Sequence, residues 1–370
     1  MRDLGGGYFY RTLNKDGKEI KKIYISLLSV GIICLGVFLG VNITKSSYAL
    51  FSASIKGEKT IEVEVEFPKI TAEIISKVGT DGIVAESHPA TTQLKANTDY
   101  RYTGANPNNY VRFNNELWRI IGVFPTDDGT GKIENRVKLI RSESIGNYAW
   151  DNKPSGTGSS TSFYGSNNWS DSALQVILNS GAYYNRTNGN CPYGMNGTTI
   201  PCDFSDVGLT AEAKNMIGNA KWYLGGSATY NDVTTNMFYT RERGIAVYSG
   251  RPTNWVGKVG LMYPSDYGYA TSGGDTTNKK TCLNQILINW ENSNYNFCAN
   301  NNWLYVNNHI QWLLTSRSDD NSLTFAIFTK GSVSSYAPIN SIIIKPVVYL
   351  KSGTKMLSGT GTSSNPYTLS

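Results

Sequence analysis

The sequence predicts an α+β protein with an antiparallel sheet and long loops, preceded by one amino-terminal transmembrane helix or signal peptide. Strand-like segments stand at both ends of the globular part, and helix-like segments lie between them in loop-rich sequence. Separate runs of strands and helices are typical of α+β folds rather than of alternating βαβ units. An uncharged hydrophobic run near the amino terminus predicts the membrane segment.

That hydrophobic run extends from Ile23 to Ile43 and would span about 31 Å as a helix, close to the thickness of the hydrocarbon core. Five basic residues between Arg11 and Lys22 precede it, whereas only Lys45 follows closely. The positive-inside rule therefore places residues 1–22 in the cytoplasm as a basic tail and the body of the chain outside.

This segment is either a permanent membrane anchor or a cleaved signal peptide. The run is longer than the usual core of a signal peptide, which favours a permanent anchor in the membrane at 23–43. Ser47 and Ala49 place small residues at the −3 and −1 positions of a cleavage site, which favours cleavage after Ala49. The protein is accordingly expected to be a single-pass membrane protein or, after cleavage, a secreted one.

The body is expected to divide into an extracytoplasmic stalk over 44–97, a globular domain over 98–354 and a carboxy-terminal tail over 355–370. In the stalk, residues 59–67 alternate apolar side chains with glutamates, as a half-buried strand does. A short helix is expected over 71–78 and a loop or linker over 79–97.

Pattern and turn residues predict the elements of the globular domain. Ser170 and Thr210 are the expected N-caps of its first two helices, because serine and threonine hydroxyls accept bonds from the free amides of a first turn. In chain order the expected elements are strands over 110–113 and 117–124 joined by a turn at Asn114-Asn115, a hairpin turn at 127–131 before a strand over 136–141, helices over 170–178, 211–217 and 282–290, and strands over 323–329 and 342–350.

The net charge of +6 is concentrated at the amino terminus. Of the 34 basic and 28 acidic residues, seven and three lie in 1–49, so 27 and 25 remain in 50–370. A nearly neutral body gives no charge-based reason to expect nucleic-acid binding. Nothing in the sequence calls for a cofactor.

The body contains Cys191, Cys202, Cys282 and Cys298, an even number that suggests two disulfides in an exported chain. Three connectivities are possible, and the local pairs Cys191–Cys202 and Cys282–Cys298 are favoured by their short spacing. A zinc site is the weaker interpretation, because no CxxC motif occurs and the chain has only two histidines.

No known catalytic motif is present, so an enzymatic role is uncertain and not favoured. His88 and His309 are expected to be structural or solvated. Asp266 suits a capping or turn role better than that of a site acid. The run Asp319-Asp320-Asn321 offers the oxygen ligands that calcium prefers, although a simple turn is the favoured explanation.

Several stretches resemble a group of uncharacterised exported proteins from gut Firmicutes, over roughly residues 70–370. These are NPNNYVRFNNELWRIIGVF (106–124), VKLIRSESIGNYAWD (137–151), KVGLMYPSDYGYATSGG (258–274), IKPVVYLKSG (344–353) and GTGTSSNPYTLS (359–370). WLLTSRS (312–318) followed by IKPVVYL is similar to the W-x-L-R-S … V-R-P-x-L pattern of DUF6273-type domains and to the closing strands of C-type-lectin-like and formylglycine-generating-enzyme-like folds. Separately, SSYALFSAS (46–54) looks like the processing region of camelysin-type exported proteins.

The lectin-like resemblance implies ligand contacts in the irregular segment between the closing strands, residues 316–340. Its side chains offer charge, hydrogen bonds and a stacking ring, from Arg317, Asp319, Asp320, Lys330 and Tyr336. A second group of aromatic residues near Gly/Ser/Asn loops is also a candidate for ligand contact, namely Tyr148, Trp150, Tyr267 and Tyr269. The family's triplets for calcium-dependent sugar binding are absent.

These features predict a surface-exposed binding protein, adhesin-like or lectin-like, whose partner is a glycan or protein at the cell surface. An extracytoplasmic enzyme acting on cell-wall or glycan material is the first alternative. A structural component of the cell envelope is the second, suggested by the Asn/Gly/Ser-rich loops and the near-zero charge of the body.

Overall fold

The computed structural model describes residues 51–55, 59–63, 66–154, 165–274 and 278–370. The predicted membrane segment at 23–43 and the cleavage site at Ala49 lie outside these ranges. Within them, none of the helices has the length and apolar character needed to cross a membrane. The chain forms two units, one ending at Pro68 and one comprising Lys69–Leu369, and each is described by itself.

The described part of the first unit contains one antiparallel pair, β1 (Phe51–Ile55) and β2 (Lys59–Val63). The strand expected over 59–67 therefore forms over its first half.

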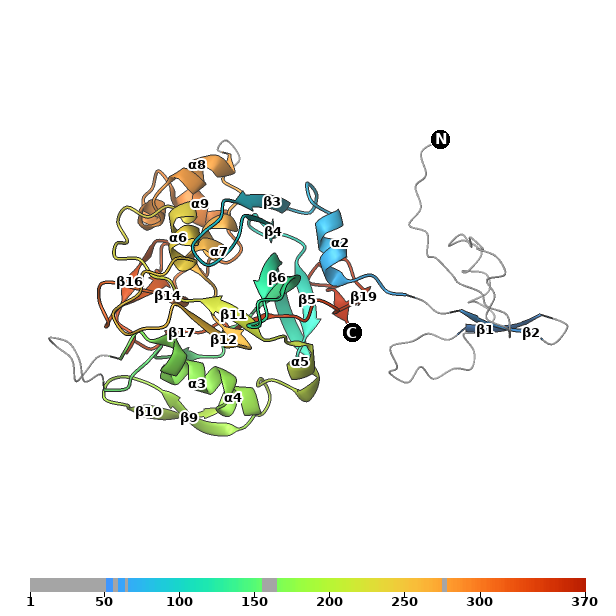
Figure 1. The fold of residues 1–370 in the computed structure, drawn as a ribbon, viewed down its shortest axis with the longest axis horizontal. Coiled ribbons are helices and arrows are strands. Elements are labelled where there is room, and N and C mark those ends of the chain that lie inside the picture. The colour runs from blue at the N-terminus through green and yellow to red at the C-terminus, as the bar shows by residue number, and fades with distance from the viewer. Residues whose placement is uncertain (1–50, 56–58, 64–65, 155–164, 275–277) are drawn as a thin grey trace. The chain divides into compact units, whose positions relative to one another are not determined.

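The largest sheet described in the second unit is antiparallel and has seven strands, of which β3, β4, β5 and β6 can be followed beside α2 in Figure 1. Its order is β13-β18-β7-β6-β4-β3, and β5 pairs with β6 beside this path. The strands are β3 (Ile83–His88), β4 (Asn97–Tyr102), β5 (Tyr110–Phe113), β6 (Glu116–Asp127), β7 (Ile133–Arg141), β13 (Val259–Gly260) and β18 (Val347–Tyr349).

A second sheet of five strands has the order β16-β15-β14-β17-β8. It is antiparallel except for one parallel pairing, between β14 and β17. Its strands are β8 (Asn147–Tyr148), β14 (Gln311–Ser316), β15 (Thr324–Ile327), β16 (Val333–Tyr336) and β17 (Ile342–Ile343). Three further two-stranded pairs are β9 (Asn188–Pro192) with β10 (Thr199–Asp203), β11 (Ala220–Tyr223) with β12 (Asn254–Gly257), and β19 (Met356–Ser358) with β20 (Thr368–Leu369).

The helices of the second unit are short, and most follow one another in the middle of the chain. They are α2 (Ile70–Ser76), the 3-10 helix η2 (Trp169–Asp171), α3 (Ala173–Asn179), α4 (Ala182–Asn185), α5 (Ala211–Met216), α6 (Thr235–Glu242), α7 (Pro264–Tyr269), α8 (Lys279–Asn284), the 3-10 helix η3 (Leu287–Glu291) and α9 (Asn296–Asn300). Mixed helices and antiparallel sheets confirm the predicted α+β class.

Local turn chemistry explains the first long hairpins. Asn114 and Asn115 join β5 to β6 with φ of 55° and 63°, the left-handed pair that a two-residue hairpin turn requires. Between β6 and β7, Asp127 Oδ1 accepts bonds from the backbone N–H groups of Gly129 (2.8 Å) and Gly131 (3.0 Å). Both predicted turns are therefore confirmed.

Capping was predicted correctly at one of the two helices. Thr210 Oγ1 accepts a bond from Ala213 N (3.1 Å) at the start of α5, as expected. At α3 the cap is Ser172, whose Oγ accepts from Gln175 N (3.1 Å), rather than Ser170. Ser170 instead lies within the 3-10 turn that precedes the helix.

Two expected elements are each divided in two. The strand predicted over 342–350 becomes β17 and β18, which belong to different sheets. Pro346 lies between them and cannot donate to a sheet ladder. The helix predicted over 282–290 becomes α8 and η3, with a break at Gln285 and Ile286.

The expected boundaries of the globular domain require correction. Residues 79–97 are not a linker throughout, because β3 pairs along its whole length with β4. Ile70 and Ile74 of α2 are buried, at 1% and 0% exposure. At the other end, β19 and β20 pair within 355–370. The compact unit therefore spans Lys69–Leu369 rather than 98–354.

Both predicted disulfides are present. Cys191–Cys202 joins β9 to β10, and Cys282–Cys298 joins α8 to α9. Each therefore ties together two elements that are close in the chain, in a region without a long helix or strand.

Candidate functional site

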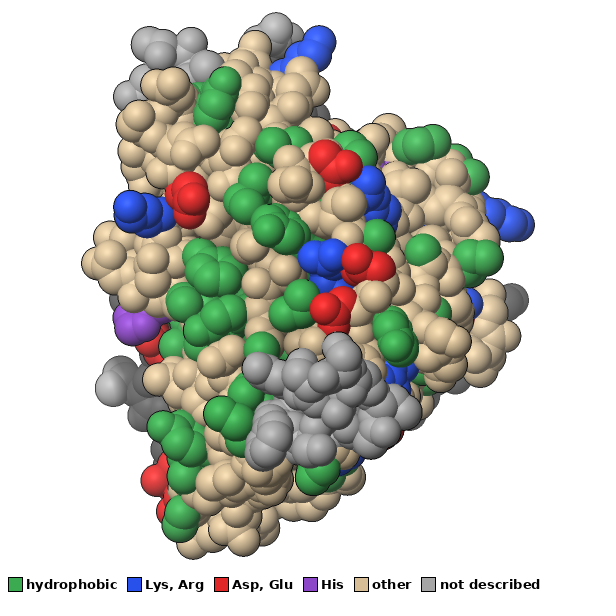
Figure 2. Space-filling view, turned by 90° about the vertical axis from the view of Figure 1, so that its left-hand side faces the viewer, with side chains coloured by type: hydrophobic (Ala, Val, Ile, Leu, Met, Phe, Trp, Pro, Cys, Tyr) green, Lys and Arg blue, Asp and Glu red, His purple; other side chains and the backbone are tan. Residues whose placement is uncertain are grey.

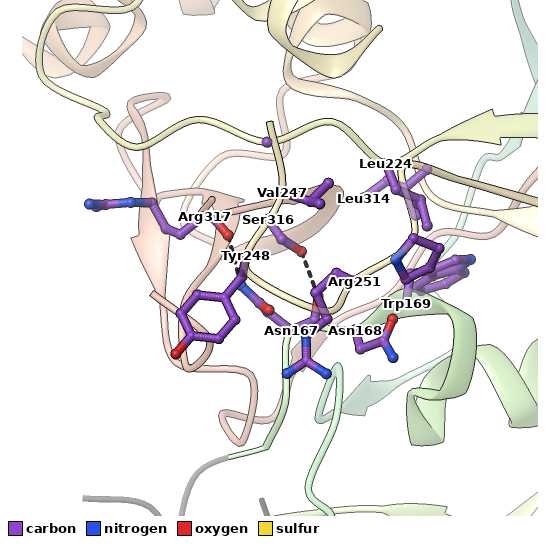
Figure 3. A pocket seen from close by; sticks show the side chains of 12 residues that line it. Asn167, Asn168, Trp169, Leu224, Val247, Tyr248, Arg251, Leu314, Ser316 and Arg317 are labelled. Atoms are coloured by element: carbon purple, nitrogen blue, oxygen red, sulfur yellow. Dashed lines mark hydrogen bonds between the residues drawn. The ribbon is translucent and has the colours of Figure 1, made fainter. Parts of the chain in front are cut away.

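A small pocket, with a cavity volume of about 20 Å³, lies where three distant segments of the compact unit meet (Figure 3). The segments are the residues entering η2, the loop before β12, and the end of β14 with its following loop. A few residues after β11 complete the wall. The lining residues are Asn167, Asn168, Trp169, Leu224, Gly226, Val247, Tyr248, Arg251, Pro252, Leu314, Ser316 and Arg317.

Asn167 connects two of these segments. Its Nδ2 lies 2.9 Å from the carbonyl oxygens of Arg317 and Leu323 and 2.7 Å from that of Asp320. Its own carbonyl accepts a bond from Ser316 Oγ (3.1 Å). Asn167 is only 4% exposed, so these bonds fix the loop after β14 in the interior of the wall.

Arg317, one of the residues predicted to contact a ligand, lines this pocket. Its guanidinium binds Asp319 through two bonds, from Nε to Oδ1 (2.8 Å) and from Nη2 to Oδ2 (2.7 Å). Nη2 also donates to the carbonyl of Ala228 (2.5 Å). The hydrogen bond from Arg317, with its charge, holds the pKa of Asp319 below its usual value against partial burial.

The other predicted ligand residues are not brought to the wall. Asp320 Oδ1 accepts bonds from Ser322 N (2.8 Å) and Ser322 Oγ (2.6 Å), which is a local turn. Lys330 and Tyr336 lie at opposite ends of β16, because Tyr336 pairs with Thr324 whereas Lys330 belongs to the turn before the strand. One surface patch built from all five residues is therefore not formed.

The acidic run 319–321 does not resemble a calcium site. Its two carboxylates are engaged by Arg317 and Ser322. Among the described residues, no three His, Cys, Asp or Glu side chains gather as a metal site would require.

Four aromatic residues proposed for ligand contact are buried. Tyr148, Trp150, Tyr267 and Tyr269 are at most 8% exposed and belong to the core or pack on its charged groups. Tyr336 is half-buried against Trp312 and Phe328. The ring that does face the pocket, Tyr248, lies in a loop that the sequence did not single out.

A second chemical feature of the compact unit is a group of buried charges, hereafter the buried ionic cluster. Asp266 Oδ1 accepts from Arg101 Nη1 (3.0 Å), and its Oδ2 accepts from Lys138 Nζ and from Tyr263 N (2.9 Å). Arg101 Nη2 also donates to Asp99 Oδ2 (2.7 Å). The predicted capping role of Asp266 is present in its bond to Tyr263, and the ion pairs add to it.

The cluster continues through α6. Glu242 accepts from Ser265 N (2.9 Å) and Ser265 Oγ (2.5 Å) and pairs with Arg243 Nη1 (3.0 Å). The Arg243 guanidinium lies 3.6 Å from the centre of the Tyr239 ring. The same ring stacks at 3.6 Å on His88, so the histidine is structural rather than solvated. The residues of the cluster, at most 4% exposed, are His88, Asp99, Arg101, Lys138, Glu242, Arg243, Ser265 and Asp266.

Gly122 allows the strands that carry this cluster to approach closely. A Cβ atom built on Gly122 would lie 2.2 Å from the carbonyl oxygen of Tyr100 on β4. Gly122 pairs with Arg101 and also, across the other edge of β6, with Lys138. Because Gly122 has no side chain, β4 with Arg101 and β7 with Lys138 can both lie close to β6 at this position.

The pH dependence of stability tests the burial of Glu242. Burial raises the pKa of Glu242 to about 7, against the opposing attraction of Arg243 and Ser265. Because the unfolded chain releases this proton near pH 4.5, the folded state binds more protons between about pH 4.5 and 7, and stability falls as pH rises through that window. Across this window the free energy of unfolding of the wild type should fall by roughly 2–3 kcal/mol on account of Glu242. Glu242→Gln has no titratable group at this position, so the variant should lack this change.

The measurement is urea unfolding of wild type and Glu242→Gln at several pH values from 4.5 to 8. The stability of the wild type relative to the variant should decrease across this range. Glu143→Gln, at an exposed glutamate, is the matched control. A difference between wild type and Glu242→Gln that stays constant with pH would contradict the assignment.

The pocket and the buried ionic cluster differ in access. The pocket is bordered by loops, whereas the residues of the cluster are at most 4% exposed. On the face drawn in Figure 2, charged side chains are scattered among uncharged ones, and some of the basic side chains lie beside an acidic one. Comparison with protein-family models, curated proteins and solved structures finds no match.

Proposed function

We propose that this chain is an extracytoplasmic binding protein whose pocket receives a polar group of a partner at the cell surface. The supporting observation is a set of three buried polar atoms on the pocket-lining residues, Asn167 Oδ1, Trp169 Nε1 and Arg251 Nε. None of the three has a hydrogen-bond partner among the described residues. Buried polar atoms are normally paired, so three unpaired ones on residues that line the same pocket favour a small polar group that supplies both donors and acceptors.

The composition of the wall favours binding over catalysis. Its described residues include no carboxylate, imidazole or thiol, the groups that acid–base or nucleophilic catalysis at a pocket generally uses. Glu242, whose pKa burial raises to about 7, belongs instead to the buried ionic cluster, whose residues are at most 4% exposed. Perturbed pKa values in a closed ion-pair network are a structural feature of the fold.

Location and fold are part of the same proposal. Two disulfides support a place outside the cytoplasm, because such bonds persist in oxidising compartments. Anchoring through 23–43, or release after Ala49, accords with that location. We further propose a C-type-lectin-like arrangement, which is supported by antiparallel sheets connected through long, loop-rich segments.

Binding through this pocket should depend on Tyr248. We expect the full chain in detergent micelles to bind members of a glycan and protein array, and Tyr248→Ala to weaken that binding by about tenfold or more, because an aromatic wall contributes both area and stacking. Tyr248 is half-buried and its ring lies 5.9 Å from the Arg251 guanidinium, so the variant should fold normally.

The matched control is Tyr193→Ala, which removes a tyrosine that is 44% exposed on the β9–β10 hairpin. It should bind as the wild type does. Equal loss in both variants, or no loss in Tyr248→Ala, would place the binding surface elsewhere. A chain that binds no member of the array would favour the structural alternative.

A further inference from the structure

Arg119 and Lys345 are two half-buried cations of the compact unit that have no carboxylate partner. Arg119 lies on β6, and Lys345 lies between β17 and β18. Within the described ranges neither side chain forms an ion pair, and each of their hydrogen bonds goes to a neutral oxygen. A partly desolvated charge without a counter-ion is unfavourable, so both groups are suited to receive an anion.

The guanidinium of Arg119 is fixed by an amide and two rings. Its Nε donates to Oδ1 of Asn109 (2.8 Å), a residue with 0% exposure. Its Cζ lies 4.4 Å from the centre of the Tyr110 ring and 4.5 Å from that of the Trp303 ring. Nη2 donates to one backbone carbonyl (3.3 Å), whereas Nη1 is neither buried nor bonded to any residue that the structure describes. The outer end of the guanidinium therefore keeps free N–H groups in a defined direction.

Lys345 is held beside the same part of the seven-stranded sheet. Its Nζ donates to the carbonyl oxygen of Ser142 (2.6 Å), directly after β7. Arg119 pairs with Ile140 of β7, and Ser142 follows two residues later, roughly 7 Å along the chain. The two cations thus come from segments more than 200 residues apart but are anchored at neighbouring positions of β6 and β7.

The acidic residues nearby do not neutralise this pair. The charge of Arg141 is taken by Glu116, which accepts from its Nε (2.8 Å) and Nη2 (2.6 Å). Glu143 is exposed and forms no ion pair with Arg119 or Lys345 among the described residues. Burial, with the charges of Arg119 and Arg141, lowers the pKa of Lys345 to about 8 against the attraction of Glu143. Burial likewise lowers the pKa of Arg119 to about 10.

We infer that Arg119 and Lys345 together bind a phosphate group, at a site separate from the pocket beside Asn167. Two cations from different segments can each donate to a different oxygen of a tetrahedral anion, and a phosphate monoester carries close to two negative charges at pH 7. A carboxylate offers one charge and two oxygens in one plane, so it should bind less tightly. This inference goes beyond the proposed function and does not depend on it.

The test is equilibrium dialysis of labelled inorganic phosphate against the full chain in non-ionic detergent micelles, with ionic strength held constant by sodium chloride. Phosphate should bind roughly tenfold or more tightly than acetate, measured by competition. Glycerol 3-phosphate is the second competitor. Its binding shows that the site accepts an esterified phosphate, whereas binding of inorganic phosphate alone identifies the free ion as the ligand.

Variants assign the binding to the two cations. Arg119→Gln and Lys345→Gln should each weaken phosphate binding by about tenfold or more, because hydrogen bonds to charged groups are the stronger class. Glu143→Gln should strengthen it, since a repelling carboxylate is removed. Lys330→Gln is the matched control, at an exposed lysine in the turn before β16, and should bind as the wild type does. Melting temperatures establish which variants are folded.

The pH dependence of binding distinguishes a direct contact of Lys345 from a structural role. Sulfate is the probe, because its charge is constant between pH 6 and 9. The affinity of the wild type should be nearly constant below pH 7 and fall about tenfold between pH 7 and 9, as the ammonium of Lys345 loses its proton. Lys345→Arg should keep the binding and lose this pH dependence, because arginine stays charged.

Three results would overturn the inference. They are equal affinity for phosphate and acetate, unchanged phosphate binding in a folded Arg119→Gln or Lys345→Gln, and a fall in sulfate affinity above pH 7 that persists in Lys345→Arg. If Arg119→Gln does not fold, the Lys345 variants still decide the outcome. None of these results bears on Tyr248-dependent binding at the pocket, so the two proposals stand or fall separately.

Discussion

Asparagine in place of Asp266 is expected to lower the free energy of unfolding by about 3–5 kcal/mol. Asp266 is 1% exposed and compensates the charges of both Lys138 and Arg101. Although burial by itself raises the pKa of Asp266, these two cations hold it below its usual value, so the group is ionised in the folded protein. Asparagine keeps the shape but leaves two buried cations with only the partial compensation of Asp99.

Urea denaturation of the wild type and Asp266→Asn measures this loss. Asp319→Asn is the control, because its carboxylate pairs with Arg317 at a side chain that is 46% exposed and should contribute less than about 1 kcal/mol. Adding Lys138→Met to Asp266→Asn should recover part of the stability by removing one uncompensated charge. If Asp266→Asn unfolds at the same urea concentration as the wild type, the ion pairs of Asp266 do not stabilise the folded protein.

Removal of either disulfide should lower the free energy of unfolding by about 3 kcal/mol. The paired cysteines are separated by 11 and 16 residues, and cross-links of that length restrict the unfolded chain by about this amount. The variants are Cys191→Ala with Cys202→Ala, and Cys282→Ala with Cys298→Ala, each compared with wild type under non-reducing conditions.

Cys34→Ala is the matched control, since Cys34 takes part in neither bond and its loss should leave stability unchanged. Treatment with dithiothreitol should lower the stability of the wild type and have no effect on a chain that lacks all four cysteines. Peptide mapping without reduction that finds four free thiols in the exported protein would contradict the pairing.

The sequence predicted best what depends on neighbours in the chain. The Asn114-Asn115 turn, the Thr210 cap and both disulfides involve partners no more than 16 residues apart. Residue type and spacing suffice for such features. The strand β3 was missed because only its first and last residues are fully buried, which leaves little apolar alternation to detect.

The charged and ligand-binding features could not be predicted in the same way. Lys138 and Asp266 are 128 residues apart, and Arg101 and Asp266 are 165 apart, so no local pattern relates them. The pocket likewise joins Asn167 to Arg317 across 150 residues. Arg317 could be singled out because a charged residue in a polar loop is recognisable from the local sequence. The buried Nε of Arg251, which has no hydrogen-bond partner among the described residues, can be recognised only in the folded structure.

The order of strands in the seven-stranded sheet determines when this sheet can be completed during folding. β18, at residues 347–349, lies inside the sheet between β13 and β7, so β7 has no second neighbour until nearly the whole chain is available. A polypeptide synthesised from its amino terminus therefore has this sheet incomplete until its last strands are made. Folding dominated by such distant pairings is slow, and the chain must stay protected from aggregation until its last strands arrive. Loss of the last 25 residues would likewise remove an inner strand rather than a peripheral tail.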